Sequence, residues 1–172
     1  IIPCVQLGFE VEDDATPVFS GTPLANGQDL STPPEFGIEV MLSDAGANAG
    51  AAIFDSTPGG PNAGGPDNDL LVGLGNILCL QSNNAPSHTT QTVAGIFDTP
   101  NDDVNGGSVF FDFPGPSHVH QIDLIDIDEE ELADAVVTLL DTGGKTRVFN
   151  VPPGWTTDIL NDGGTGFGTL GL

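Results

Sequence analysis

The sequence predicts an all-β fold, an antiparallel β-sandwich of jelly-roll type that is rich in turns and loops. Short segments alternate apolar and polar residues with the period of two that half-buried strands require. Glycine (24 residues) and proline (14 residues) separate these segments at short intervals. Only the segment from Asp128 to Ala135 has a helical pattern, and it is long enough for one or two turns at most. Many short strands divided by turns are typical of sandwiches and jelly rolls.

Each strand is predicted from its own pattern. Cys4 to Val11 alternates, with Val5, Leu7 and Phe9 on one face. The glycine-bearing segment from Asp141 to Lys145 predicts a hairpin loop between two strands. In chain order the predicted strands are Cys4–Val11, Phe36–Leu42, Ala51–Asp55, Gly75–Gln81, Val93–Phe97, Ser108–Phe113, His118–Asp128, Ala135–Leu140 and Thr146–Val151.

No repeat of 20 to 50 residues is evident, so we expect a single sandwich domain over residues 13–172. Residues 1–12 form a separate N-terminal strand segment, a candidate donor strand for another copy of the chain. The chain starts at Ile1 without a methionine or a charged leader, which we interpret as a processed N-terminus.

The charge of the chain restricts its partners. Its 172 residues include 25 Asp and Glu but only two basic residues, Lys145 and Arg147, for a formal net charge of −23. Such a chain cannot neutralise a row of phosphates, so we exclude nucleic acid as a partner and disfavour anionic membrane surfaces. No apolar run is long enough for a membrane span, so we expect no membrane insertion. The scarcity of Met and Lys favours an extracellular or cell-surface location.

The two cysteines, Cys4 and Cys79, suit a single disulfide in an oxidising compartment. Two buried free thiols are the alternative interpretation. Their spacing does not indicate whether the bond would form within one chain or between two.

No catalytic motif stands out, and we expect no enzymatic activity and no catalytic residues. His118 and His120 share a strand face at a spacing that metal ligands can have, but His88 is remote, so surface histidines are the preferred interpretation. A nucleophile elbow is absent, and Leu139 replaces the first glycine of a phosphate-binding loop. A glycosidase would need a cleft with aromatic platforms, whereas the chain has no Tyr and only Trp155 as tryptophan.

Calcium is the strongest chemical prediction, because this hard cation takes carboxylate, amide and carbonyl oxygens from loops. The first candidate combines Asp55 with Asp67-Asn68-Asp69 and Asn76. Asp126 and Asp128 add weight, because they share a strand face with apolar residues, where a carboxylate needs a cation. The second candidate is the segment 101–106, Asn-Asp-Asp-Val-Asn-Gly, for which a hairpin turn is the preferred interpretation.

Several blocks resemble the secreted bacterial β-sandwich domains common in PEP-CTERM-type and related surface proteins. They are Ile53-Phe54-Asp55, the segment 65–70, Gly75-Asn76-Ile77-Leu78, the segment 106–113 and Leu124-Ile125-Asp126-Ile127-Asp128-Glu129. The resemblance implies an exported, calcium-compatible jelly roll of surface or matrix proteins. Carried over by this resemblance, the metal-ligand positions are Glu10, Asp55, Asp67, Asp69, Asn76, Asp126 and Asp128.

The chain departs from that family after Trp155, where a closing strand is expected but a glycine-rich tail, residues 163–172, follows. A missing closing strand would leave an edge open to a strand from another copy, and the segment from Ile1 to Val11 would suit it. We therefore expect an extracellular, Ca²⁺-binding structural protein that assembles with itself, head to tail, into a filament or surface matrix. The alternative is a non-catalytic carbohydrate-binding or adhesion module whose partners would be glycans.

Overall fold

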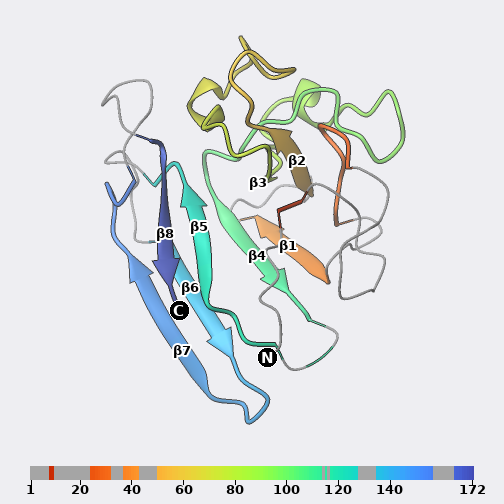
Figure 1. Ribbon diagram of the computed structural model, residues 1–172. Helices are drawn as coiled ribbons and strands as arrows, with labels where there is room; N and C mark the ends of the chain where they lie inside the picture. Colours follow the sequence, from red (N-terminus) through yellow and green to blue (C-terminus); the bar gives the residue numbers. More distant parts are fainter. Residues whose placement is uncertain are drawn as a thin grey trace. The chain divides into compact units, whose positions relative to one another are not determined.

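The computed structural model (Figure 1) describes residues 8–9, 24–31, 37–42, 50–113, 115, 117–127, 135–156 and 165–172. Over these residues it contains antiparallel strands and two short 3₁₀ helices, η1 (Asn68–Leu70) and η2 (Pro86–Thr89). The predicted all-β class is therefore confirmed, and no helix of the described part is long and apolar enough to cross a membrane. The face-to-face sheet packing of a sandwich stays a prediction.

The chain folds as two compact units. Unit 1 comprises Ile1–Asp67 and Gly73–Phe113, and unit 2 comprises Asn68–Val72 and Pro114–Leu172. This division does not test whether residues 13–172 form the single sandwich domain that we expected, so that domain stays a prediction. Of the predicted donor segment 1–12, only Gly8 and Phe9 are described, so strand donation lies outside the described residues.

Unit 1 contains two two-stranded antiparallel sheets. The first pairs β1 (Ile38–Leu42) with β4 (Gly107–Phe111), and the second pairs β2 (Ala51–Asp55) with β3 (Asn76–Leu80). The segment 27–30 runs beside β2, because the N–H of Leu30 donates to the carbonyl of Ala51 at 2.8 Å and that of Ile53 donates to Gln28 at 2.9 Å. Pairing on both sides explains why β2 is apolar over four consecutive residues.

The core of unit 1 draws side chains from both sheets. Its buried members are Leu24, Leu30, Ile38, Ala51 and Ile53, with Phe9, Leu78, Val109 and Phe111 packed against them. Burial of these aliphatic and aromatic groups is the main force that holds the sheets of this unit together.

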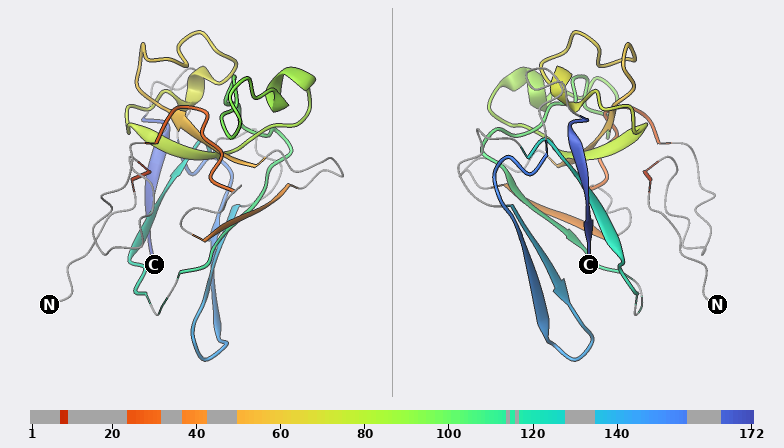
Figure 2. Two further views of the ribbon diagram at one scale, coloured as in Figure 1. Left: turned by 90° about the vertical axis from the view of Figure 1, so that its right-hand side faces the viewer. Right: turned by 60° about the vertical axis from the view of Figure 1, so that its left-hand side comes forward.

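Unit 2 contains the sheet of β5 (Gln121–Ile125) with β8 (Phe167–Gly171) and the hairpin of β6 (Ala135–Leu140) with β7 (Thr146–Val151) (Figures 1 and 2). The hairpin loop closes because Oδ1 of Asp141 accepts the N–H groups of Gly143 at 2.8 Å and Lys145 at 3.0 Å. Gly144 has φ +77°, a conformation that glycine adopts without strain.

Most predicted strands are confirmed. Ala51–Asp55, Ala135–Leu140 and Thr146–Val151 match residue for residue, and the ends of β1, β3 and β4 lie within two residues of the predicted ends. β5 lies inside its predicted segment and is three residues shorter at each end. Cys4–Val11 and the helical segment 128–134 lie outside the described residues, except for Gly8 and Phe9.

Two strand predictions are wrong. Val93–Phe97 is a turn, because Gly95 has φ +80° and the N–H of Ile96 donates to the carbonyl of Val93 at 3.0 Å. The C-terminal segment, which we expected to lack a closing strand, forms β8 and pairs with β5 from Gln121↔Gly171 to Ile125↔Phe167. β5 therefore has a partner strand where we expected a missing closing strand to leave an open edge.

Candidate functional site

The loops that follow β2 and β3 in unit 1 hold most of the buried polar side chains of the described residues. Gln81 and Ser82 are fully buried, and Asn62, Asn101 and Asp103 are each at most 9% exposed. Buried polar groups are costly unless they are bonded, so their partners reveal what organises the loops.

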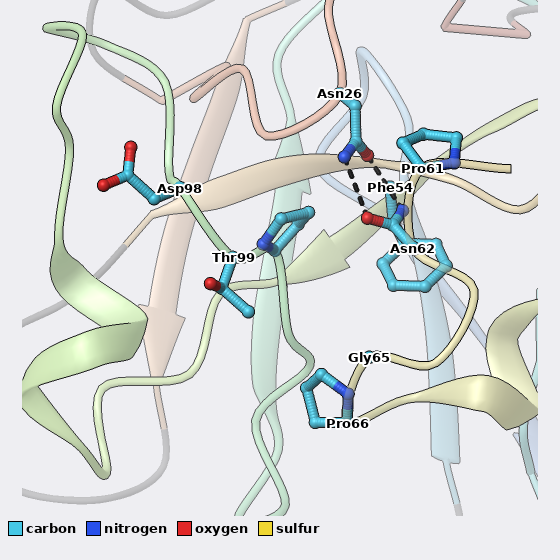
Figure 3. Close-up of a pocket in the computed structure, with 9 residues that line it drawn as sticks. Asn26, Phe54, Pro61, Asn62, Gly65, Pro66, Asp98 and Thr99 are labelled. Carbon is cyan, nitrogen blue, oxygen red and sulfur yellow. Dashed lines mark hydrogen bonds between the residues drawn. The ribbon is translucent and has the colours of Figure 1, made fainter.

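Asn26 and Asn62 clamp the first loop to the end of β2 (Figure 3). Their side-chain amides bond to each other twice, at 2.8 and 2.9 Å. Oδ1 of Asn26 also accepts the N–H of Asp55 at 2.9 Å, and Nδ2 of Asn62 donates to the carbonyl of Asp55 at 3.0 Å. The two amides thus bond the N–H and the carbonyl of the last residue of β2, which is paired with Asn76 of β3 on its other edge.

Gln81 organises the second group of loops. Its Oε1 accepts the N–H of Asn101 at 3.1 Å, and its Nε2 donates to the carbonyls of His88 at 2.8 Å and Thr99 at 3.1 Å. Because the side chain is fully buried, all of these bonds are shielded from water. One residue therefore fixes three separate points of the segment 88–101.

A pocket of about 330 Å³ lies between these loops (Figure 3). Its single ionisable group is Asp98, whose carboxylate accepts the N–H of Thr92 at 2.9 Å and its hydroxyl at 2.7 Å. The Thr92 hydroxyl and N–H lower the pKa of Asp98, so this carboxyl is ionised at neutral pH. The lining residues, of which only Asp98 carries a carboxylate, are Asn26, Phe54, Pro61, Asn62, Gly65, Pro66, Asp98, Thr99 and Pro100.

The predicted calcium ligands fall into different places. Asp55 and Asn76 lie opposite each other in the β2–β3 register, but Oδ1 of Asp55 accepts the N–H of Thr57. Nδ2 of Asn76 donates to the carbonyls of Phe9 at 3.0 Å and Leu24 at 3.4 Å, which ties two distant segments to β3.

The other predicted ligands that the structure describes have contacts of their own. Asp67 accepts the N–H of Asp102 through Oδ2 at 2.9 Å. Asp69 and Asp126 belong to unit 2, where Asp69 accepts the N–H of Leu70 and Asp126 has φ +60° just after β5. Glu10 and Asp128 lie outside the described residues. Within the residues that the structure describes, no three or more His, Cys, Asp or Glu side chains gather around a common point, and Ca²⁺ binding stays a prediction.

Cys79 is a buried free thiol whose Sγ lies 3.6 Å from the carbonyl oxygen of Ala52. Burial raises its pKa, and the negative charges of Asp102 and Asp67 raise it further. Cys4 lies outside the described residues, so the Cys4–Cys79 disulfide stays a prediction.

The two histidines, for which a surface position was the preferred interpretation, are not in a strand. His118 and His120 precede β5, are exposed, and stack with ring centroids 6.5 Å apart. Trp155, the aromatic residue considered for a glycan platform, is partly buried against Gly168 of β8.

Sequence reasoning missed Asn26, Asn62 and Gln81 as organisers of the loops. The one available signal was Gln81, a polar residue that directly follows the apolar strand β3. No protein-family model, curated protein or solved structure matches the chain.

Proposed function

We propose that the chain is an extracellular structural protein that self-associates through the β6–β7 hairpin of unit 2, with Ca²⁺ offsetting the repulsion between acidic copies. The observation that carries the proposal is the uncharged face of this hairpin. Val136, Leu140 and Val148 are 55%, 71% and 59% exposed. The register places them on one face with Thr138, Thr146 and Asn150, so the face carries no charge in a chain of net charge −23.

The hairpin also has strand edges to offer. Among the described strands, β6 pairs only with β7 and β7 only with β6. Isolated two-stranded hairpins are marginally stable in water, and an open edge accepts a strand from another chain. Binding of a partner would bury the exposed aliphatic side chains and pair an outer edge.

Charge favours a second copy of the chain as the partner. Lys145 and Arg147, the only lysine and arginine residues of the chain, both lie on the hairpin and are exposed. Unit 1 contains neither lysine nor arginine. Lys145 in the hairpin loop and Arg147, on the face opposite Val148, therefore complement the acidic unit 1 of the next copy. Such contacts join different surfaces, and contacts of this kind generate open, head-to-tail assemblies.

The test compares two matched substitutions by sedimentation velocity and negative-stain microscopy. Val148→Asp adds a charge to the hairpin face, whereas Val93→Asp adds the same charge at a valine of unit 1 that is 58% exposed. We expect the wild type and Val93→Asp to form assemblies and Val148→Asp to stay dispersed. Circular dichroism verifies that both variants are folded.

Two results would overturn the proposal: a wild type that stays monomeric at every concentration, with or without calcium, or equal disruption by the two variants. Assemblies that persist in a chelator would retain the hairpin interface and remove the role of calcium.

A further inference from the structure

Two buried oxygen atoms in the segment 101–106 accept no hydrogen bond. Asn101 is 6% exposed and Asp103 is 5% exposed, and both Oδ1 of Asn101 and Oδ2 of Asp103 lack a partner. A buried carboxylate oxygen without a donor or a counter-charge is strongly destabilising. Native proteins therefore satisfy such atoms with a bound ion or an ordered water when the chain itself offers no donor.

The remaining polar atoms of these two residues are already engaged. Nδ2 of Asn101 donates to the carbonyl of Asp102 at 3.0 Å, which fixes the orientation of the amide. Turning the amide over would place its oxygen against that carbonyl. Oδ1 of Asp103 accepts the N–H of Asn105 at 2.9 Å, and the carbonyl of Asp103 accepts the N–H of Gly106 at 2.7 Å. The predicted turn is present, but it closes no hairpin, because Asp102 before it bridges Gln81 and β4 after it pairs with β1. The turn leaves one oxygen of each side chain without a partner.

The two oxygens belong to the side chains on either side of Asp102. Asp102 forms an antiparallel bridge with Gln81, so the backbone is extended at this point. Residues two apart in an extended segment direct their side chains to the same side, which applies to Asn101 and Asp103.

Unit 1 offers no lysine or arginine to neutralise Asp103, because Lys145 and Arg147 lie in unit 2. Further negative charge is close at hand, since the carboxylate of Asp67 bonds the N–H of Asp102 at 2.9 Å. The local field is therefore negative and uncompensated by the basic side chains of the unit.

We propose that Oδ1 of Asn101 and Oδ2 of Asp103 are ligands of a Ca²⁺ ion bound by the segment 101–106. An amide oxygen and a carboxylate oxygen are donors that Ca²⁺ takes, and backbone carbonyls and water commonly complete its shell. Structural zinc sites are built mainly from cysteine and histidine, and the one cysteine of the described residues, Cys79, is buried with its Sγ beside the carbonyl of Ala52. This site differs from the Asp55–Asn76 set, deepens the calcium part of the proposed function, and does not require self-association.

The test is the melting temperature in calcium and in excess chelator, together with calorimetric titration of CaCl₂. A site of few charges in an extracellular module has a Kd on the order of 10⁻⁴–10⁻³ M. At calcium about ten times the Kd, we expect a rise in Tm of about 3–6 °C. Asp103→Asn should abolish this rise while raising the Tm in chelator, because it removes an uncompensated buried charge.

Asp112→Asn is the matched control. It removes one carboxylate of unit 1, but at an exposed position beyond β4, about 17 Å of extended chain from the turn. Asn101→Asp is a second variant, which should lower the Tm in chelator and enlarge the calcium-dependent rise. An equal calcium response in Asp103→Asn and the wild type would overturn the site, as would no response in the wild type.

Repeating the titration in the Val148→Asp background separates this inference from the proposed function. A calcium response in dispersed protein supports the site whether or not the wild type assembles. Calcium-independent melting of a protein that does assemble would overturn the site alone.

Discussion

Asn26 and Asn62, 36 residues apart in the chain, bind each other through both groups of their side-chain amides, at 2.8 and 2.9 Å. The same pair holds the N–H and the carbonyl of Asp55, so the clamp joins two loops to the last residue of β2. All of these groups depend on one another, because removal of either amide leaves buried partners unsatisfied.

We predict that Asn62→Ala destabilises unit 1 by about 1–3 kcal/mol, the cost of unsatisfied buried groups. The free energy of unfolding, measured by urea titration and circular dichroism, tests this. Asn84→Ala is the control, since Asn84 is exposed in a neighbouring loop of the same unit. Equal stability of the two variants would show that the clamp contributes nothing.

The glycines of β8 provide a second matched pair of substitutions. A Cβ atom at Gly168 would lie 2.9 Å from Cζ3 and 3.1 Å from Cη2 of Trp155, whereas one at Gly171 meets nothing within 4 Å. We predict that Gly168→Ala lowers the stability of unit 2 by about 1–3 kcal/mol through overpacking. Gly171→Ala should change it little. The melting temperatures of the two variants test this prediction. Equal melting temperatures of Gly168→Ala and Gly171→Ala would contradict the close packing of Trp155 against Gly168.

Cys79 predicts a pH dependence of stability. Its folded-state pKa is raised above the ordinary value of 9.0 by burial, so the folded thiol stays protonated while the unfolded thiol ionises. The contribution of this difference in pKa to the free energy of unfolding is fully present below pH 9.0, where both states hold the proton. It is lost as the pH rises above that value, because only the unfolded thiol then ionises. Cys79→Ala should flatten the decline of stability between neutral and alkaline pH, as urea titrations at each pH would reveal.

Thiol labelling checks the same residue and also the predicted disulfide. We expect Cys79 to resist an alkylating reagent in native protein and to react in denaturant without reductant. Labelling in the native state would contradict its burial. Failure to react in denaturant until a reductant is added would instead establish a bridge to Cys4 or to another chain.

The sequence revealed strands from short runs rich in apolar and β-branched residues, as in β2, β6 and β7. It failed at β8, because glycine is depleted in strands and therefore argues against one. At Gly168 the missing Cβ leaves room for the indole of Trp155, a contact that the local sequence does not show. It also failed at Val93–Phe97, which turns at Gly95 and pairs with the segment 27–29 only through an isolated bridge from Ile96 to Gln28.

The candidate site was less predictable from the sequence. Acidic residues are so frequent that their positions alone could not separate surface carboxylates from buried ones. The burial of Asp103 and the exposure of Asp112 follow from tertiary packing, not from their neighbours in the chain. Asn26 and Asn62 meet through a contact across 36 residues that no local pattern encodes.

The packing of Trp155 against Gly168 has a practical consequence. The chain has no tyrosine and no other tryptophan, so its intrinsic fluorescence arises from one indole that belongs to unit 2. Unit 1 contains only phenylalanine as an aromatic chromophore and is nearly invisible to this signal. Emission of Trp155 followed beside backbone circular dichroism therefore distinguishes two units that melt together from two that melt separately, without any label.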